Sequence, residues 1–130
     1  MFMKRYPFIA ADFTVPINTT SVTPTNFTAL EVPLKGVWMA GLTMYVKGGH
    51  ASCSATVTFV FVSYDSLRDA WDTVAYYTGT VAMVGTAAAQ VTVVFDASVE
   101  KIKLYSIHNP ETSTGYTAIC NASLIGHFME

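Results

Sequence analysis

The chain has 130 residues, of which 52% are hydrophobic and only 12% are charged, against a usual charged share of about 25%. This length suits one domain with one core, and the scarcity of charge predicts that neighbouring subunits cover part of the surface, unless Thr, Ser and Asn cover it instead. The net charge of −2 without a basic cluster argues against nucleic acid as a partner, and no stretch approaches the ~20 apolar residues of a membrane-spanning helix.

Residues 1 to 26 differ from the rest of the chain. Pro7, Pro16 and Pro24 punctuate a run rich in Thr, Asn and Ser, which predicts an extended N-terminal arm. Two paths are open to it: it lies along its own domain as an edge strand through residues 6 to 14, or it reaches a neighbouring subunit. Its aromatic side chains are the candidates for docking onto a partner; they are Phe2, Tyr6, Phe8 and Phe13.

From residue 27 onward, apolar residues recur at every second position, which is typical of half-buried β-strands. The first two such segments cover residues 27 to 34 and 36 to 47. The second has Trp38 on its apolar face and ends at a turn at Gly48 and Gly49. The clearest segment covers residues 52 to 64. Its second half is apolar on both faces, which predicts that a partner or another segment covers it.

Residues 65 to 72 hold three acids and one arginine, but their spacing lacks the order of a calcium loop, so we expect a solvated connection with at most a helical turn. Further on, Lys101 and Lys103 alternate along one predicted strand and are interpreted as a solvated strand face. Five more strands are predicted at residues 71–77, 80–84, 90–96, 99–108 and 115–128, with breaks at Gly79, at Gly85 and the alanines after it, and at Asn109-Pro110.

Residues 27 to 130 thus form one domain of eight predicted strands, and no segment of ten or more residues has a convincing helical repeat. The pattern favours an all-β fold: an antiparallel two-sheet sandwich, a jelly roll of about eight strands, with the extended arm attached. A seven-stranded immunoglobulin-like sandwich is the rival, but Trp38 and the two cysteines do not follow the order Cys, Trp, Cys.

The sequence contains no motif for catalysis. It has neither a Gly-x-Ser-x-Gly elbow nor a glycine-rich phosphate loop, and its carboxylates fall mostly at predicted strand ends or in loops. Cys53 and Cys120 lie in apolar alternating segments and are predicted to be reduced core residues. The three histidines have no ligand spacing with them, so we expect no enzyme activity, no cofactor and no metal.

Trp71, Tyr76 and Tyr77 are the candidate ligand site. Exposed aromatic rings stack on the apolar face of a sugar, so one interpretation is a carbohydrate platform formed by these residues with Trp38. The competing interpretation, which we favour, places Trp38 in the core and packs the other three rings at a sheet edge.

Four segments carry a family resemblance: Ser63-Tyr64-Asp65-Ser66, Trp71-Asp72, the strand of residues 99–105, and the closing strand of residues 117–126. Their order resembles that of small jelly-roll virion proteins of tailed bacteriophages. The resemblance spans about residues 27 to 128 and is one of layout. Those families often have a Gly in the loop after the Asp, where this chain has Leu67 and Arg68.

The resemblance implies a capsid decoration, or cement, protein on the capsid surface of a virion, made in the host cytoplasm. Such proteins sit on the lattice as trimers or other oligomers and brace neighbouring capsomers by burying surface, without chemistry. The expected partners are therefore copies of this chain, with a trimer favoured, and the major capsid protein lattice. The alternative is a carbohydrate- or receptor-binding module of a phage tail or fibre that uses Trp71, Tyr76 and Tyr77.

Overall fold

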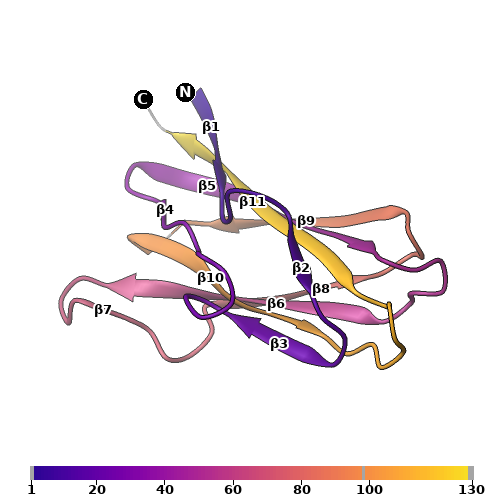
Figure 1. Cartoon of the computed structure of the whole chain (residues 1–130). Helices are drawn as coiled ribbons and strands as arrows, with labels where there is room; N and C mark the ends of the chain where they lie inside the picture. The colour runs from indigo at the N-terminus through magenta and orange to yellow at the C-terminus, as the bar shows by residue number, and fades with distance from the viewer. Residues whose placement is uncertain (1, 98, 129–130) are drawn as a thin grey trace.

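The computed structural model describes residues 2–97 and 99–128, and within these ranges every regular element is a β-strand (Figure 1). The strands form two antiparallel sheets that pack face to face, which confirms the predicted all-β sandwich. Over the described ranges there is accordingly no helix with the length and apolar character needed to cross a membrane.

The first sheet is built around β11 (Ala118–Phe128). On one side β11 pairs with β5 (Val37–Gly48), which pairs with β9 (Ala88–Asp96); on its other side lie β1 (Phe2–Pro7) and β2 (Phe13–Val15). The second sheet is built around β10 (Lys101–Asn109) and β6 (Thr56–Asp65). It also contains β3 (Thr19–Val22), β4 (Val32–Pro33), β7 (Ala70–Trp71) and β8 (Tyr77–Ala82).

Eight of these strands have the interleaved order of a jelly roll. The order is β2-β11-β5-β9 in the first sheet and β3-β10-β6-β8 in the second, so the chain passes back and forth between the sheets. Two of the eight, β2 and β3, come from the segment predicted to be an arm. The predicted strand at residues 27–34 contributes only the two-residue pairing β4, and the one at residues 71–77 contributes β7 and the first residue of β8.

The leading segment therefore takes the first of its two predicted paths and lies against its own domain. β1 pairs with β11 from Phe2 opposite Phe128 to Pro7 opposite Ser123, and so begins earlier than the edge strand that the sequence predicts at residues 6 to 14. The exposed surface of 6880 Å² is close to the ~6,700 Å² of a compact monomer of this mass.

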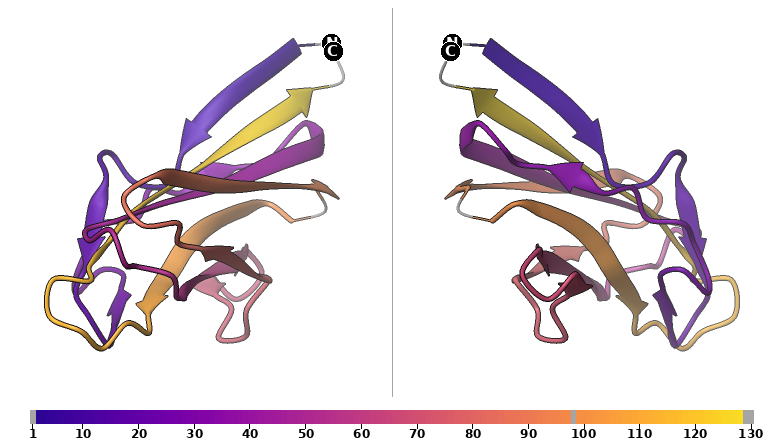
Figure 2. Two further views of the ribbon diagram at one scale, coloured as in Figure 1. Left: turned by 90° about the vertical axis from the view of Figure 1, so that its right-hand side faces the viewer. Right: turned by 90° about the vertical axis from the view of Figure 1, so that its left-hand side faces the viewer.

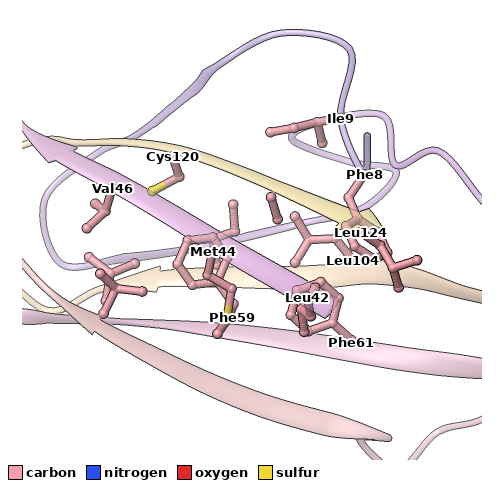
Figure 3. Close-up of a cluster of buried hydrophobic side chains, with 14 of the residues drawn as sticks. Phe8, Ile9, Leu42, Met44, Val46, Phe59, Phe61, Leu104, Cys120 and Leu124 are labelled. Carbon is pink, nitrogen blue, oxygen red and sulfur yellow. The ribbon is translucent and has the colours of Figure 1, made fainter. Parts of the chain in front are cut away.

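The core fills the space between the sheets, as Figure 3 shows for part of it. Alternate residues of β5, β6, β10 and β11 point inward, in keeping with the period-two pattern. Cys53 and Cys120 are buried free thiols, as predicted. The turn that follows β6 contains no helix, and Asp69 adopts a positive φ of 52° there, so the expected solvated connection is confirmed.

Trp38 is a correction, because it does not lie in the core. The register between β5 and β11 shifts where Met39 faces His127 but Val37 faces Phe128, so Trp38 is an extra residue in a β-bulge. A bulge interrupts the strict alternation and re-aims the side chain. Trp38 is 37% exposed, and its ring meets the edge of the His127 ring at 6.3 Å between centroids.

Gly48, at the end of β5, lies where two segments come close together. A Cβ atom there would overlap the Gly85 carbonyl oxygen and lie 2.7 Å from the Cys53 Cβ, so we expect Gly48→Ala to lower the free energy of unfolding by about 1–3 kcal/mol. Gly41 on the same strand is the control, since its added Cβ would only meet Thr92 Cγ2 at 4.0 Å. Urea titrations of both variants test this, and equal stability of the two would contradict it.

Burial makes Cys120 resistant to ionisation. Loss of hydration raises the pKa of its thiol to about 12, and the nearby Asp12 charge adds to the effect. We expect iodoacetamide to label Cys120 at pH 8.5 only after the protein is unfolded. As the folded pKa is the higher one, stability should fall as pH rises from about 9 toward 12. Labelling of the native protein as fast as in urea would refute this.

Candidate functional site

The four predicted docking residues lie in different environments. Phe8 is fully buried and its ring packs on Phe61 at 5.0 Å, so it belongs to the core and is not available to a partner. Tyr6 and Phe13 are half-buried against the same core. Only Phe2 presents a large free surface, with 50% of it exposed. The aromatic residues of the leading segment therefore serve mainly to attach it to its own domain.

Phe2 belongs to a surface that we call the β1 surface, formed by Phe2, Met3, Lys4 and Arg5. The Phe2 ring stacks on Phe128 at 4.7 Å and 4°, while Met3, on the opposite face of the strand, is 65% exposed. Within the described residues, the outer edge of β1 has no partner strand. Figure 2 shows β1 and the end of β11 rising away from the six-stranded sheet, and all four residues of the β1 surface are exposed.

The predicted carbohydrate platform is not formed as one surface. The Tyr76 ring meets Phe95 at 5.9 Å and the Tyr77 ring meets Phe61 at 6.4 Å, so both tyrosines pack against the core cluster beside β9. Trp71 lies elsewhere, on β7, where its ring meets the edge of the Tyr64 ring at 5.4 Å. The two tyrosines thus pack at a sheet edge, and Trp71 has other neighbours.

Trp71 also lines a cavity of about 320 Å³ against the six-stranded sheet, which we call the Trp71 cavity. Val60 and Val62 of β6 supply apolar lining, and Trp71 and Tyr105 supply aromatic rings. The polar groups of the lining come from Thr23, Asp72, Thr73 and Lys103. Within the described ranges, no three His, Cys, Asp or Glu side chains are grouped so as to hold a metal.

A second β-bulge helps to build this cavity. The register between β10 and β6 shifts between Leu104 and Ser106, so Tyr105 has no partner on β6 and is 45% exposed. The turn after β3 holds the bulge in place, because the Thr23 N–H donates to the Tyr105 carbonyl at 2.9 Å.

Two hydrogen bonds fix the start of the loop after β7. The Asp72 N–H donates to the Ser63 carbonyl at 2.9 Å, and the Ser63 hydroxyl donates to Asp72 Oδ2 at 2.9 Å. Both partners of Asp72 are thus atoms of a β6 residue that is itself buried. The carboxylate at the cavity is therefore oriented before any ligand arrives.

Two lysines lie over the aromatic rings at the edge of the sheet. Lys101 Nζ is 4.3 Å from the centre of the Tyr64 ring and pairs with Glu31 at 2.7 Å. Lys103 Nζ is 4.4 Å from the centre of the Trp71 ring. The Tyr64 hydroxyl donates to Asp69, which raises the pKa of Tyr64 to about 12. That phenol is therefore neutral at physiological pH.

The sequence pattern identified Trp71 but missed its neighbours. The alternation of charges predicts a solvated strand face for Lys103. Its position over an indole ring depends on β7, a pairing only two residues long. Tyr105 has no distinguishing signal, because a bulge within an alternating strand leaves no mark in hydropathy. Only the proximity of Asp72 to Trp71 in the chain pointed to a shared location.

Comparisons with known proteins bear on the fold. No protein-family model matches the chain, and no curated protein matches its sequence. A chain in the structure of infectious bursal disease virus, Gx strain, is 10% identical with a TM-score of 0.53, over 96% of this chain and 31% of that chain. Murine APRIL is 9% identical with a TM-score of 0.50, over 97% of this chain and 100% of that one.

The SPBc2 prophage-derived protein YomS is also similar, at 12% identity and a TM-score of 0.47, over 97% of this chain and 94% of that chain. At such identities a likeness concerns the fold alone. The virus chain and APRIL, with the higher scores, support one conclusion: the chain has a jelly-roll-like β-sandwich fold.

Proposed function

We propose that this chain is a structural protein of a virion, and more narrowly a capsid decoration protein that binds the lattice and copies of itself by non-covalent contacts. The observation that carries the proposal is the β1 surface. It combines exposed apolar side chains with a strand edge whose backbone groups are open to a partner. The fold likeness to a virus chain is compatible with this role but adds no support for it beyond the fold.

Contact through the β1 surface would work by burial and strand addition. An extended segment of a neighbour can pair with an open sheet edge, and Phe2 and Met3 would be covered in the process. Stable interfaces bury roughly 1,600 Å² in total. The low charged share of the chain, 12%, fits a protein whose surface is partly covered by neighbours.

The charges on β1 favour a particular geometry between copies. Lys4 and Arg5 lie in the middle of the strand, so two β1 strands pairing with each other would bring like charges together. A head-to-tail contact, in which β1 meets a different part of the next copy, avoids this repulsion. Such a contact closes into a ring when the rotation permits, in keeping with the favoured trimer.

Light scattering of the purified full-length chain tests the proposal. We expect a trimer, and a double variant Phe2→Ser with Met3→Ser that remains folded but is monomeric. The control is Leu67→Ser with Val74→Ser, which removes two exposed apolar side chains far from β1 along the chain and should leave the trimer intact. A wild-type monomer that immunogold electron microscopy also fails to find on assembled particles would refute the proposed function.

A further inference from the structure

We propose that the Trp71 cavity is a binding site for one neutral sugar ring. The site goes beyond the proposed structural role, because a decoration protein needs no small-molecule ligand. It also differs from the platform expected from the sequence, since Tyr76 and Tyr77 take no part in it. The residues that form it are Thr23, Val60, Trp71, Asp72, Lys103 and Tyr105.

The size and apolar lining of the cavity suit a pyranose. Its volume of about 320 Å³ is at the lower end of the ~300–1,000 Å³ typical of small-molecule sites, which fits one ring better than a long chain. Val60 and the half-exposed Tyr105 ring offer apolar and aromatic surface, and Trp71 adds to the lining although Lys103 covers one face of its ring. One face of a pyranose consists of C–H groups, and such a face packs on aromatic rings with little loss of hydration.

The polar groups of the cavity include both donors and acceptors of hydrogen bonds, as the hydroxyls of a sugar require. Lys103 only donates hydrogen bonds and the Asp72 carboxylate only accepts them, whereas the Thr23 hydroxyl, which accepts from the Ala29 N–H at 3.2 Å, has a hydrogen left to donate. Each hydroxyl of a sugar is both a donor and an acceptor, so one ring can satisfy all three. A hydrocarbon would remove water from Lys103 and Asp72 and give nothing in return.

The charges select against ionic ligands. The cavity contains one cation, Lys103, and one anion, Asp72, and the nearby Lys101 and Glu31 neutralise each other at 2.7 Å. A ligand carboxylate would gain from Lys103 but be repelled by Asp72, and a ligand ammonium group would face the reverse. A neutral polyhydroxyl compound avoids both penalties.

The site is organised before a ligand binds. Asp72 is oriented by Ser63, Lys103 rests over the Trp71 ring, and the Tyr105 bulge is held by Thr23. Fixed side chains lower the entropy cost of binding. The cavity belongs to the six-stranded sheet, whereas β1 belongs to the other sheet, so the sugar site and the β1 surface share no residue.

Tryptophan fluorescence provides a direct measurement, because the chain has only two tryptophans. In a Trp38→Phe variant, Trp71 is the sole reporter. We would titrate this full-length variant with the methyl glycosides of glucose, galactose, mannose and N-acetylglucosamine. At least one should give a saturable change in emission with a Kd on the order of millimolar, as is reasonable for so small a ligand.

Substitutions in the lining of the cavity test whether the sugar binds there. Tyr105→Ala and Asp72→Asn, made in the same background, should each weaken binding by about tenfold or more. Val74→Ala is the matched control, because Val74 is an exposed residue in the same loop but is not part of the cavity lining, and its Kd should be unchanged. Thermal unfolding and light scattering of each variant establish that the fold and the oligomeric state are intact.

Three results would overturn the inference: no saturation with any of the four glycosides, an unchanged Kd in Tyr105→Ala, or binding of methyl glucuronide or glucosamine more than tenfold tighter than that of the neutral glycosides. None of these three results depends on whether the chain forms a trimer. Failure of this site and failure of the proposed structural role are therefore separate outcomes.

Discussion

Replacing Phe8 with alanine is expected to lower the free energy of unfolding by about 3–5 kcal/mol. Phe8 lies in the leading segment, yet its side chain is fully buried and packs on Phe61. Removing the ring leaves a cavity between the sheets that the surrounding strands can fill only in part. Urea denaturation followed by tryptophan fluorescence would measure the loss.

The same substitution at Phe2 is the matched control. Phe2 is in the same segment and also stacks on an aromatic ring, but half of its surface is exposed, so Phe2→Ala should cost less than about 1 kcal/mol in the monomer. If Phe8→Ala were as mild as Phe2→Ala, the leading segment would not be part of the core in solution, and an extended arm would again be the better description.

Asn109→Asp should be the other severe change, with a loss of about 3 kcal/mol or more at neutral pH. Asn109 is fully buried. Its amide nitrogen donates to the carbonyls of Val15 at 3.2 Å and Tyr116 at 3.1 Å, and its amide oxygen accepts from the Glu111 N–H at 3.1 Å. Aspartate has the same shape but would set a carboxylate oxygen against two carbonyl oxygens.

The loss should shrink as pH falls, because a protonated carboxyl regains one donor. Asn26→Asp is the control: Asn26 is exposed and its side-chain oxygen accepts from the Val22 N–H at 2.9 Å, a bond that aspartate can also accept. That change should cost less than about 0.5 kcal/mol. Denaturation curves at pH 4 and pH 8 separate the two variants, and equal losses would show that Asn109 does not join the sheets.

Asn109 also illustrates how residues 1 to 26 contact the rest of the chain. It joins β2, within the first 26 residues, to the segment before β11. The proline-rich composition of that first segment predicted extended backbone, which is what β1, β2 and β3 have. Composition carries no information on which neighbour an extended segment pairs with, since pairing depends on strands more than 80 residues away.

The residues of the candidate site also differ in whether local sequence or strand pairing reveals them. Trp71 is identified as a candidate by the sequence alone. Tyr105 and Trp38 are exposed because of β-bulges, which arise when two partner strands differ by one residue between fixed pairings. Such a difference belongs to a pair of strands, so the alternation of either strand by itself cannot reveal it.

Local sequence by itself determined that this protein is an all-β sandwich with reduced core cysteines, because a period-two apolar pattern commits a chain to half-buried strands whatever their partners. The tertiary structure decided that the leading segment completes the jelly roll, that Phe8 is core, and that Lys103, Tyr105 and Asp72 meet Trp71. Those outcomes depend on strand pairing and register, which link residues distant in the chain and are selected by the packing of the whole core.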